Sequence, residues 1–103
     1  MNVELKHLFI RHVVTTQAYD NSKPDERKKF FDEINKVGKD FGTKLIFWGT
    51  PWGVPESLSL VFESDKSLDN FTSFLRAHFS RMEQLGLKPF WNSGTTITVI
   101  ARE

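Results

Sequence analysis

The segment LKHLFIRHVV, residues Leu5–Val14, is the part of the chain from which the fold can be argued. Its residues predict a β-strand with two different faces, because successive side chains of a strand point in opposite directions. One face would carry Lys6, Leu8, Ile10, His12 and Val14, and the other Leu5, His7, Phe9, Arg11 and Val13. We expect the first face to pack on helices. The second mixes apolar side chains with an imidazole and a guanidinium, so we expect it to line a cavity between two subunits.

Two amphipathic helices and three further strands are predicted after this segment. The first helix begins with Ser22 as its cap and Pro24 in its first turn, and its apolar side is formed by Phe30, Ile34, Val37 and Phe41. The second begins within 64–67 and ends at Gly86, and its apolar side is formed by Leu68, Phe71, Leu75, His78, Phe79 and Met82. The strands are 44–48, 58–62 and 95–101, and a loop with two glycines and two prolines joins the first two.

The order of these elements predicts one α+β domain over residues 1–103 with a ferredoxin-like βαββαβ fold. Right-handed crossovers give a four-stranded antiparallel sheet of order 4-1-3-2, with both helices on one face. A register taken from the strand midpoints brings two sets of side chains together on the other face: His7, Phe9 and Arg11 beside Glu63, Val61 and Ser59. That face is too apolar to leave in water, and a dimer in which two sheets face each other would cover it.

Composition argues against several classes of function. The chain of 103 residues has a formal net charge of +1, so neither a nucleic acid nor a membrane surface is an expected partner. It has no cysteine, which removes disulfides and is compatible with the cytoplasm, the compartment we expect. No cofactor is expected, because the glycine motifs that bind phosphates and dinucleotides are absent. No metal is expected either: His78 would meet His12 above the sheet as a core histidine, and the pair has no matched carboxylate.

One passage of the sequence resembles a known superfamily. Val61-Phe62-Glu63-Ser64-Asp65, followed by Leu68, Phe71 and His78, is similar to the step from strand to helix in the dimeric α/β-barrel superfamily, which includes the antibiotic-biosynthesis-monooxygenase-like domains. Length and element order fit this superfamily over nearly the whole chain. The resemblance implies a homodimer and, as in many members, a small-molecule pocket between sheet and helices. Chemistry varies widely across the superfamily, so the resemblance does not fix a reaction.

His7, Arg11 and Glu63 are the predicted catalytic residues. In the assumed register His7 and Glu63 would form a hydrogen bond that fixes the imidazole tautomer and raises its basicity. Arg11 could then hold a carboxylate or an enolate-like oxygen. This arrangement suits proton transfer in, or cofactor-independent oxygenation of, a small acidic or phenolic compound. The alternative is structural: Arg11 and Glu63 form an ion pair at the dimer interface, and His7 lies at a solvated strand end.

The predicted ligand pocket is made of aromatic and hydroxyl side chains: Phe9, Ser59, Trp48, Trp52, Trp91 and Thr98. The alternative for the rings is ordinary packing in the core or the dimer. The leading functional hypothesis is a homodimer that binds a small apolar or aromatic metabolite, with a cofactor-independent monooxygenase or isomerase as its enzymatic version. The alternatives are an RNA-binding module that stacks bases on Phe9, and a non-catalytic scaffold or regulatory partner that dimerises.

Overall fold

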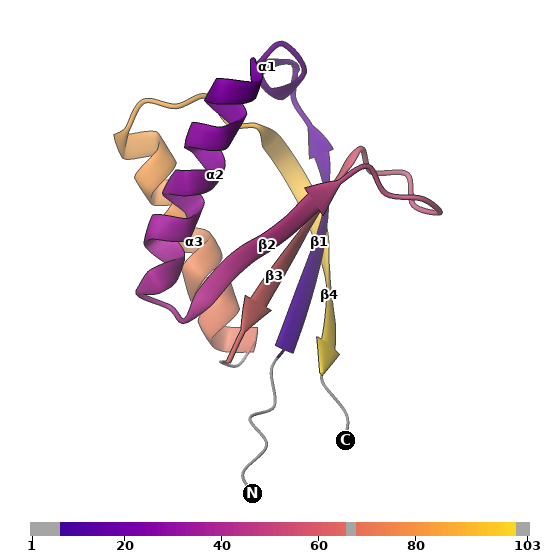
Figure 1. The fold of residues 1–103 in the computed structure, drawn as a ribbon, viewed down its shortest axis with the longest axis vertical. Helices are drawn as coiled ribbons and strands as arrows, with labels where there is room; N and C mark the ends of the chain where they lie inside the picture. The colour runs from indigo at the N-terminus through magenta and orange to yellow at the C-terminus, as the bar shows by residue number, and fades with distance from the viewer. Residues whose placement is uncertain (1–6, 66–67, 101–103) are drawn as a thin grey trace, which may run out of the picture.

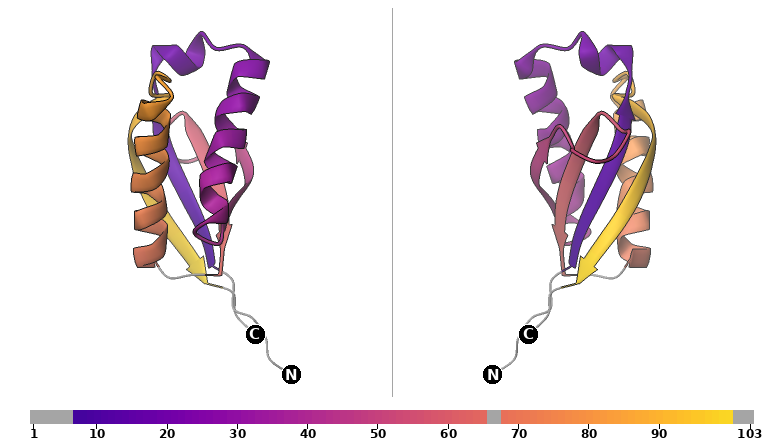
Figure 2. Two further views of the ribbon diagram at one scale, coloured as in Figure 1. Left: turned by 90° about the vertical axis from the view of Figure 1, so that its left-hand side faces the viewer. Right: turned by 90° about the vertical axis from the view of Figure 1, so that its right-hand side faces the viewer.

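The computed structural model, which describes residues 7–65 and 68–100, is a two-layer α+β structure (Figure 1). Its elements in chain order are β1 (His7–Thr15), α1 (Gln17–Asp20), α2 (Pro24–Lys39), β2 (Thr43–Gly49), β3 (Leu58–Ser64), α3 (Leu68–Gln84) and β4 (Trp91–Ile100). The strands form one antiparallel sheet, and the two long helices lie side by side on one of its faces (Figure 2). The strand order β2-β3-β1-β4 confirms both the predicted order 4-1-3-2 and the ferredoxin-like fold.

The N-cap of helix α2 is Lys23, one residue beyond the predicted cap Ser22. The backbone N–H of Lys23 donates to the Glu26 carboxylate at 3.1 Å, and Pro24 occupies the first turn, where a backbone N–H is not needed. The prediction that Ser22 caps this helix was wrong, because Ser22 Oγ donates to the carbonyl of Tyr19 at 2.5 Å and so closes the preceding helix α1. None of the helices within 7–65 and 68–100 is long and apolar enough to span a membrane.

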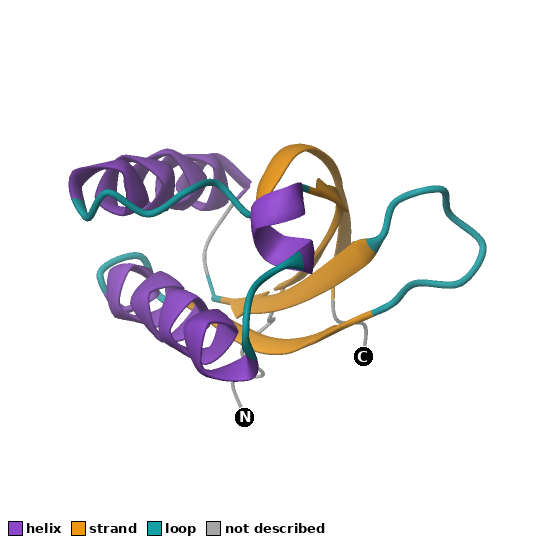
Figure 3. Ribbon diagram, turned by 90° about the horizontal axis from the view of Figure 1, so that it is seen from above, coloured by secondary structure: helices purple, strands orange, loops and turns teal. Residues whose placement is uncertain are grey.

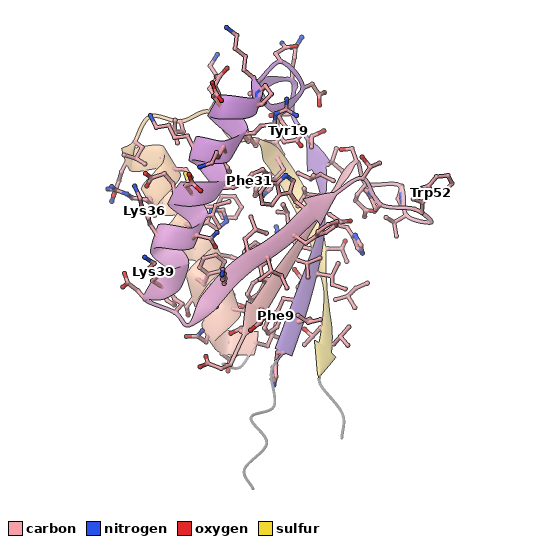
Figure 4. The ribbon with its side chains drawn as sticks, viewed as in Figure 1. Phe9, Tyr19, Phe31, Lys36, Lys39 and Trp52 are labelled. Atoms are coloured by element: carbon pink, nitrogen blue, oxygen red, sulfur yellow. The ribbon has the colours of Figure 1, made fainter. Side chains whose placement is uncertain are left out.

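Phenylalanine rings fill the space between the helices and the sheet. Phe9 of β1 stacks on Phe71 of α3 with ring centroids 4.2 Å apart, and Phe74 contacts Phe62 of β3 edge-on. Helix α2 adds Phe31 to the same layer (Figure 4). Because each ring removes a large apolar area from water, this layer is the main source of folding stability.

The two faces of β1 are the reverse of those predicted. Phe9 and Val13 are fully buried beneath the helices, whereas Leu8, Ile10 and His12 are half-buried on the face without helices. The expectation that the Phe9 face lines a cavity between subunits was therefore wrong. Both faces of this strand carry apolar residues, so alternation within β1 alone does not identify the covered one.

The predicted register between β1 and β3 was also wrong by one residue, in agreement with this reversal. His7 pairs with Ser64 and Arg11 pairs with Leu60, where the prediction had Glu63 and Ser59. A slip of one residue moves every side chain of a strand to the opposite face. The alternation of β3 indicates which face of the sheet the helices cover, because Leu58, Leu60 and Phe62 are all buried under them.

The face of the sheet that lacks helices is rich in apolar residues, and we call it the open face. The register places these side chains on it: Leu8, Ile10, His12, Val14, Phe47, Ser59, Val61, Glu63, Thr95, Ile97 and Val99. The exposed fraction is 65% for Phe47 and 47% for Ile97. A contiguous apolar surface of this kind is typical of a site of protein–protein interaction.

Strand β4 begins at Trp91, earlier than the predicted start at 95. The backbone N–H of Thr16 donates to the Phe90 carbonyl at 2.9 Å, and its hydroxyl donates to the Pro89 carbonyl at 2.6 Å. These bonds hold the entry of β4 against the end of β1, so that Trp91 lies at the edge of the helical layer. β4 then pairs with β1 down to His7.

Candidate functional site

A pocket of about 280 Å³ lies between the helices and the beginning of β4. Its walls are mainly aromatic and aliphatic, with one carboxylate, and they are formed by Phe30, Phe79, Met82, Glu83, Leu87, Pro89, Phe90 and Trp91. A larger and more polar hollow of about 580 Å³, between α1, the start of α2 and the loop before β4, shares Phe30, Leu87 and Phe90 with it. Because these walls are common to both, the two pockets are neighbours.

Arg11 of β1 extends into the layer between the sheet and α3. Its Nη1 donates to Thr96 Oγ1 of β4 at 3.1 Å. Gly94 leaves space for the guanidinium, because a Cβ at that position would lie 3.0 Å from Arg11 Cζ and 2.9 Å from both the His12 carbonyl oxygen and Val13 Cγ1. The glycine in β4 is therefore required by this close approach.

The guanidinium of Arg11 is partly buried and has no carboxylate partner among the residues that the structure describes. Its Nε is buried and makes no hydrogen bond there. Burial lowers the pKa of Arg11, because removal of water disfavours the charged form. A cation that is withdrawn from water without a counter-charge is costly, and it attracts an anion.

His78 of α3 lies beside Arg11 and is 1% exposed. Burial, and secondarily the positive charge of Arg11, lowers the pKa of His78 to about 4, so the imidazole is neutral at neutral pH. Its ring stacks on Phe79 at 4.3 Å and lies 6.3 Å from the ring of Trp91. Within the described chain, His78 Nδ1 makes no hydrogen bond.

Trp91 connects this polar cluster to the pocket. Its indole ring forms part of the pocket wall, is nearly buried and meets Phe30 edge-on at 5.4 Å. The indole Nε1, which can only donate, is buried without an acceptor in the described residues. Arg11, His78 and Trp91 thus each have a buried nitrogen without a partner, and Trp91 is the one of the three that lines the apolar pocket. Unsatisfied groups of this kind are uncommon and call for an explanation.

The structure separates the three predicted catalytic residues. His7 and Arg11 lie on the helix-covered face, whereas Glu63 lies on the open face opposite Leu8. The expected hydrogen bond between His7 and Glu63 and the expected pairing of Arg11 with Glu63 were both wrong, because the two sides of the sheet divide these groups. The ring of His7 is 5.9 Å from Phe9, toward the end of the sheet away from the pocket.

The six predicted ligand-pocket residues are dispersed as well. Trp91 lines the pocket, and Phe9 is fully buried in the core, so it is not available to stack RNA bases as the RNA-binding alternative required. Trp48 packs on Phe31 at 4.3 Å, and Thr98 is exposed opposite Phe9 on the edge strand β4. The remaining two are remote from the pocket: Ser59 lies on the open face, and Trp52 lies in the loop between β2 and β3.

The two histidines that were expected to meet are also on opposite sides of the sheet. His12 Nδ1 is 2.6 Å from Ser59 Oγ on the open face. His78, a residue of α3, is buried on the helix-covered side of the sheet. Over residues 7–65 and 68–100, no group of three or more histidine, aspartate or glutamate side chains is arranged to hold a metal ion.

Gly94 and the link between Arg11 and His78 were not identified from sequence. Gly94 was assigned to the loop before the last strand, although a glycine among β-branched residues can indicate a close approach of another group. His78 was placed correctly on the inner side of its helix, but the face error of β1 matched it with His12 instead of Arg11. When Arg11 is placed on the helix-covered face of β1, it becomes the neighbour of His78.

No sequence family model matches the chain, and no curated protein matches it in sequence. Several solved structures are similar in fold. A dimeric ferredoxin-like protein of unknown function from Thermobifida fusca is 12% identical, with a TM-score of 0.53 over 98% of this chain and 95% of that one. The hydroxynitrile lyase of Passiflora edulis is 13% identical, with a TM-score of 0.51 over 97% and 95%.

A variant of the chlorite dismutase of Candidatus Nitrospira defluvii has a TM-score of 0.57 at 10% identity, over 97% of this chain. The match spans 42% of the dismutase chain, so this protein corresponds to less than half of that enzyme. At these identities the likeness concerns the fold alone. It confirms the predicted ferredoxin-like fold.

Proposed function

We propose that this protein binds a small aromatic acid in the pocket beside Trp91, with Arg11 neutralising the acid group. The observation that carries the proposal is the half-buried guanidinium of Arg11, whose buried Nε makes no hydrogen bond and which has no carboxylate partner in the described chain. A ligand carboxylate or phenolate would supply the missing charge and accept charge-assisted hydrogen bonds. The indole N–H of Trp91, which has no acceptor in the described chain, would donate a hydrogen bond to the same acid group or to a neighbouring oxygen of the ligand.

The size and walls of the pocket support one aromatic ring as the apolar part of the ligand. Its volume of about 280 Å³ is close to the lower end of the range for ligand pockets, roughly 300–1,000 Å³. Phe30, Phe79 and Trp91 offer ring faces and edges against which an aromatic ligand would pack. A single aromatic ring with a short acidic substituent fits both the volume of the pocket and its aromatic walls.

Binding is better supported than proton transfer. A general base works best with a pKa near the operating pH, and the pKa of His78 is lowered to about 4. Along β1, His7 is four residues from Arg11, about 13 Å at the rise of a strand. Glu63 lies on the open face. Of the predicted catalytic set, the proposal therefore retains Arg11.

An enzymatic version, such as a cofactor-independent oxygenase or isomerase, is the second candidate. The observation that favours it is the position of His78 beside Arg11. Burial is the main cause of the low pKa of His78, and the charge of Arg11 is the second. An anion bound at Arg11 would offset the second cause and make His78 more basic than in the free protein, while burial would still lower its pKa.

We also propose that the protein is a homodimer through the open face. The apolar side chains there, with Phe47 65% exposed, support burial against another protein surface. A second copy would offer the same apolar face, as a two-fold interface requires. The structural neighbour from Thermobifida fusca is described as dimeric, which agrees with this proposal.

The binding proposal is tested with benzoate, its hydroxy derivatives and phenylacetate, each compared with the uncharged amide of the same shape. We expect the acids to raise Tm and to change the emission of Trp91, whereas the amides do so at least tenfold more weakly, since about 1.4 kcal/mol corresponds to a factor of ten. Amides that bind as well as the acids, or a panel without any effect, would contradict the proposal.

The decisive variant is Arg11→Met. It should lose about tenfold or more in affinity for the acids. It should also leave the ligand-free protein as stable as the wild type or more stable, because a methionine of similar length carries no buried charge. A structural arginine would give the opposite pattern, with lower stability and unchanged binding. Arg76→Met, on the exposed side of α3, is the matched control.

A further inference from the structure

The loop between β2 and β3, residues 50–57, extends from the sheet on the side opposite the helices (Figure 3). We call it the arm. Trp52 lies at its outer end and is 97% exposed, more than any of the other exposed large apolar side chains of the described chain (Figure 4). A fully solvated tryptophan leaves a large apolar area in water, and tryptophan is the residue most enriched at the centres of protein interfaces.

Hydrogen bonds to β1 fix the base of the arm. The backbone N–H of Ser57 donates to the Val13 carbonyl at 3.1 Å, and the N–H of Thr15 donates to Ser57 Oγ at 3.0 Å. The two hydroxyls, of Thr15 and Ser57, lie 2.8 Å apart. Two prolines stiffen the arm, and Gly53 has a φ of +84° where the chain turns. Its direction away from the chain's own body is therefore built into the fold.

Exposed apolar residues of the open face lie close to the base of the arm. Phe47, two residues before the end of β2, is 65% exposed on the open face. Val14, at the end of β1 next to the base of the arm, is 51% exposed. Figure 1 shows the arm projecting beyond the plane of the strands on this side of the sheet. A molecule that covers the open face therefore meets the arm as well.

We propose that the arm clasps a second copy of this chain, so that Trp52 of each subunit is buried on its partner. The proposal rests on the homodimer proposed above. Two sheets that pack face to face are about 10 Å apart, so an arm that rises above one sheet has to pass along the rim of the other. A two-fold axis then makes two equivalent contacts, one from each subunit.

A second copy fits the arm better than a membrane does. Membrane-binding loops and helices combine apolar residues with lysine or arginine, which attract anionic lipids. The arm contains no lysine and no arginine, and its one charged residue is Glu56. Its stiffness also favours a fixed protein partner, because a segment that is already ordered loses little entropy on binding.

The test measures dimerisation and the environment of Trp52 in the full chain. We expect Trp52→Ala to raise the dimer dissociation constant by about tenfold or more in sedimentation equilibrium, as for a buried tryptophan at an interface. The difference in fluorescence emission between the wild type and Trp52→Phe gives the emission of Trp52 alone. In the dimer, this emission should be blue-shifted and shielded from iodide. In Ile10→Asp, in which the charge prevents the open faces from packing, it should be red-shifted and quenched by iodide. Leu85→Ala, an exposed apolar residue beyond the end of α3, is the control and should change neither quantity.

The outcomes separate the two proposals. If the wild type dimerises, Ile10→Asp is monomeric and Trp52→Ala dimerises within twofold of wild type, the arm proposal is wrong and the homodimer stands. If the wild type is monomeric at all concentrations tested, both are wrong. A blue shift of Trp52 that appears only with phosphatidylcholine–phosphatidylglycerol vesicles would overturn the clasp in favour of membrane contact.

Discussion

The two faces of the sheet differ in what each one lacks. The helix-covered face has Arg11 without a counter-charge in the described chain, although its apolar groups are well buried. On the open face, the adjacent residue His12 has a hydrogen-bond partner in Ser59, while the apolar groups around it remain exposed. An unpaired charge in an apolar layer is a condition that a small anion can relieve. An uncovered apolar surface is a condition that another protein surface can relieve.

The largest expected difference between the two faces is in the free energy of unfolding of variants at the adjacent residues Phe9 and Ile10. Phe9→Ala should lower the free energy of unfolding by about 3–5 kcal/mol, because it leaves a cavity beneath Phe71. Ile10→Ala should lower stability mainly at protein concentrations at which the dimer forms. Urea unfolding at two concentrations, about a hundredfold apart, measures both effects, since only dimer stability depends on concentration. A concentration-independent loss of the same size for both variants would contradict the comparison.

Acid should destabilise the covered face through His78. The pKa of His78 is about 4 in the folded protein and 6.5 by reference, so the unfolded chain binds more protons between these pH values. The free energy of unfolding therefore falls as the pH decreases from 6.5 toward 4, by roughly 3 kcal/mol from this residue. Urea unfolding across this range should give a flatter pH profile for His78→Phe than for wild type. Parallel profiles would show that His78 ionises with equal ease in both states.

Gly94→Ala tests the space beside Arg11. The new Cβ would lie 2.9 Å from the His12 carbonyl oxygen, which belongs to the backbone and cannot turn away. We expect a loss of about 1–3 kcal/mol in stability together with weaker binding of aromatic acids. Gly49→Ala is the matched control in β2, where the nearest atom is 3.5 Å away on the Phe47 ring. Equal stability losses for the two glycines would argue against a crowded site at Gly94.

The smallest effect is expected for the polar pair of the open face. Ser59→Ala removes the partner of His12, but both residues are half-buried, so water replaces the hydroxyl in the monomer. The free energy of unfolding should change by less than about 1 kcal/mol at low protein concentration. A loss of 2 kcal/mol or more would mean that the open face is drier in the single subunit than its exposure indicates.

The order of elements and of strands could be predicted because both follow from local patterns and chain connectivity. The helical spacing of Phe30 and Ile34 and the alternation of Leu58, Leu60 and Phe62 are features of single segments. The register between β1 and β3 is not. It depends on packing between residues far apart in the chain, and both choices bury apolar side chains of β1.

The candidate site was predicted in its components but not in its arrangement. Arg11 was selected because a guanidinium among apolar residues of a strand suits neither a dry core nor a plain solvent face, and Trp91 because rings beside loops often line pockets. Their neighbour His78 was expected on the helix-covered side, as observed, but Arg11 was expected on the opposite face of the sheet. Gly94 carries no side chain, so its importance is visible only from the distance to Arg11.

The position of β1 at the centre of the sheet has a consequence for how the chain folds. Its partners are synthesised long after it: 47 residues separate His12 from Ser59, and 85 separate Arg11 from Thr96. Pairings of such high sequence separation form slowly, because the intervening chain has to be ordered first. During synthesis, β1 remains without its second neighbour until β4 has left the ribosome. Since β4 also brings Trp91, the pocket proposed to bind the ligand is completed in the same step that closes the sheet.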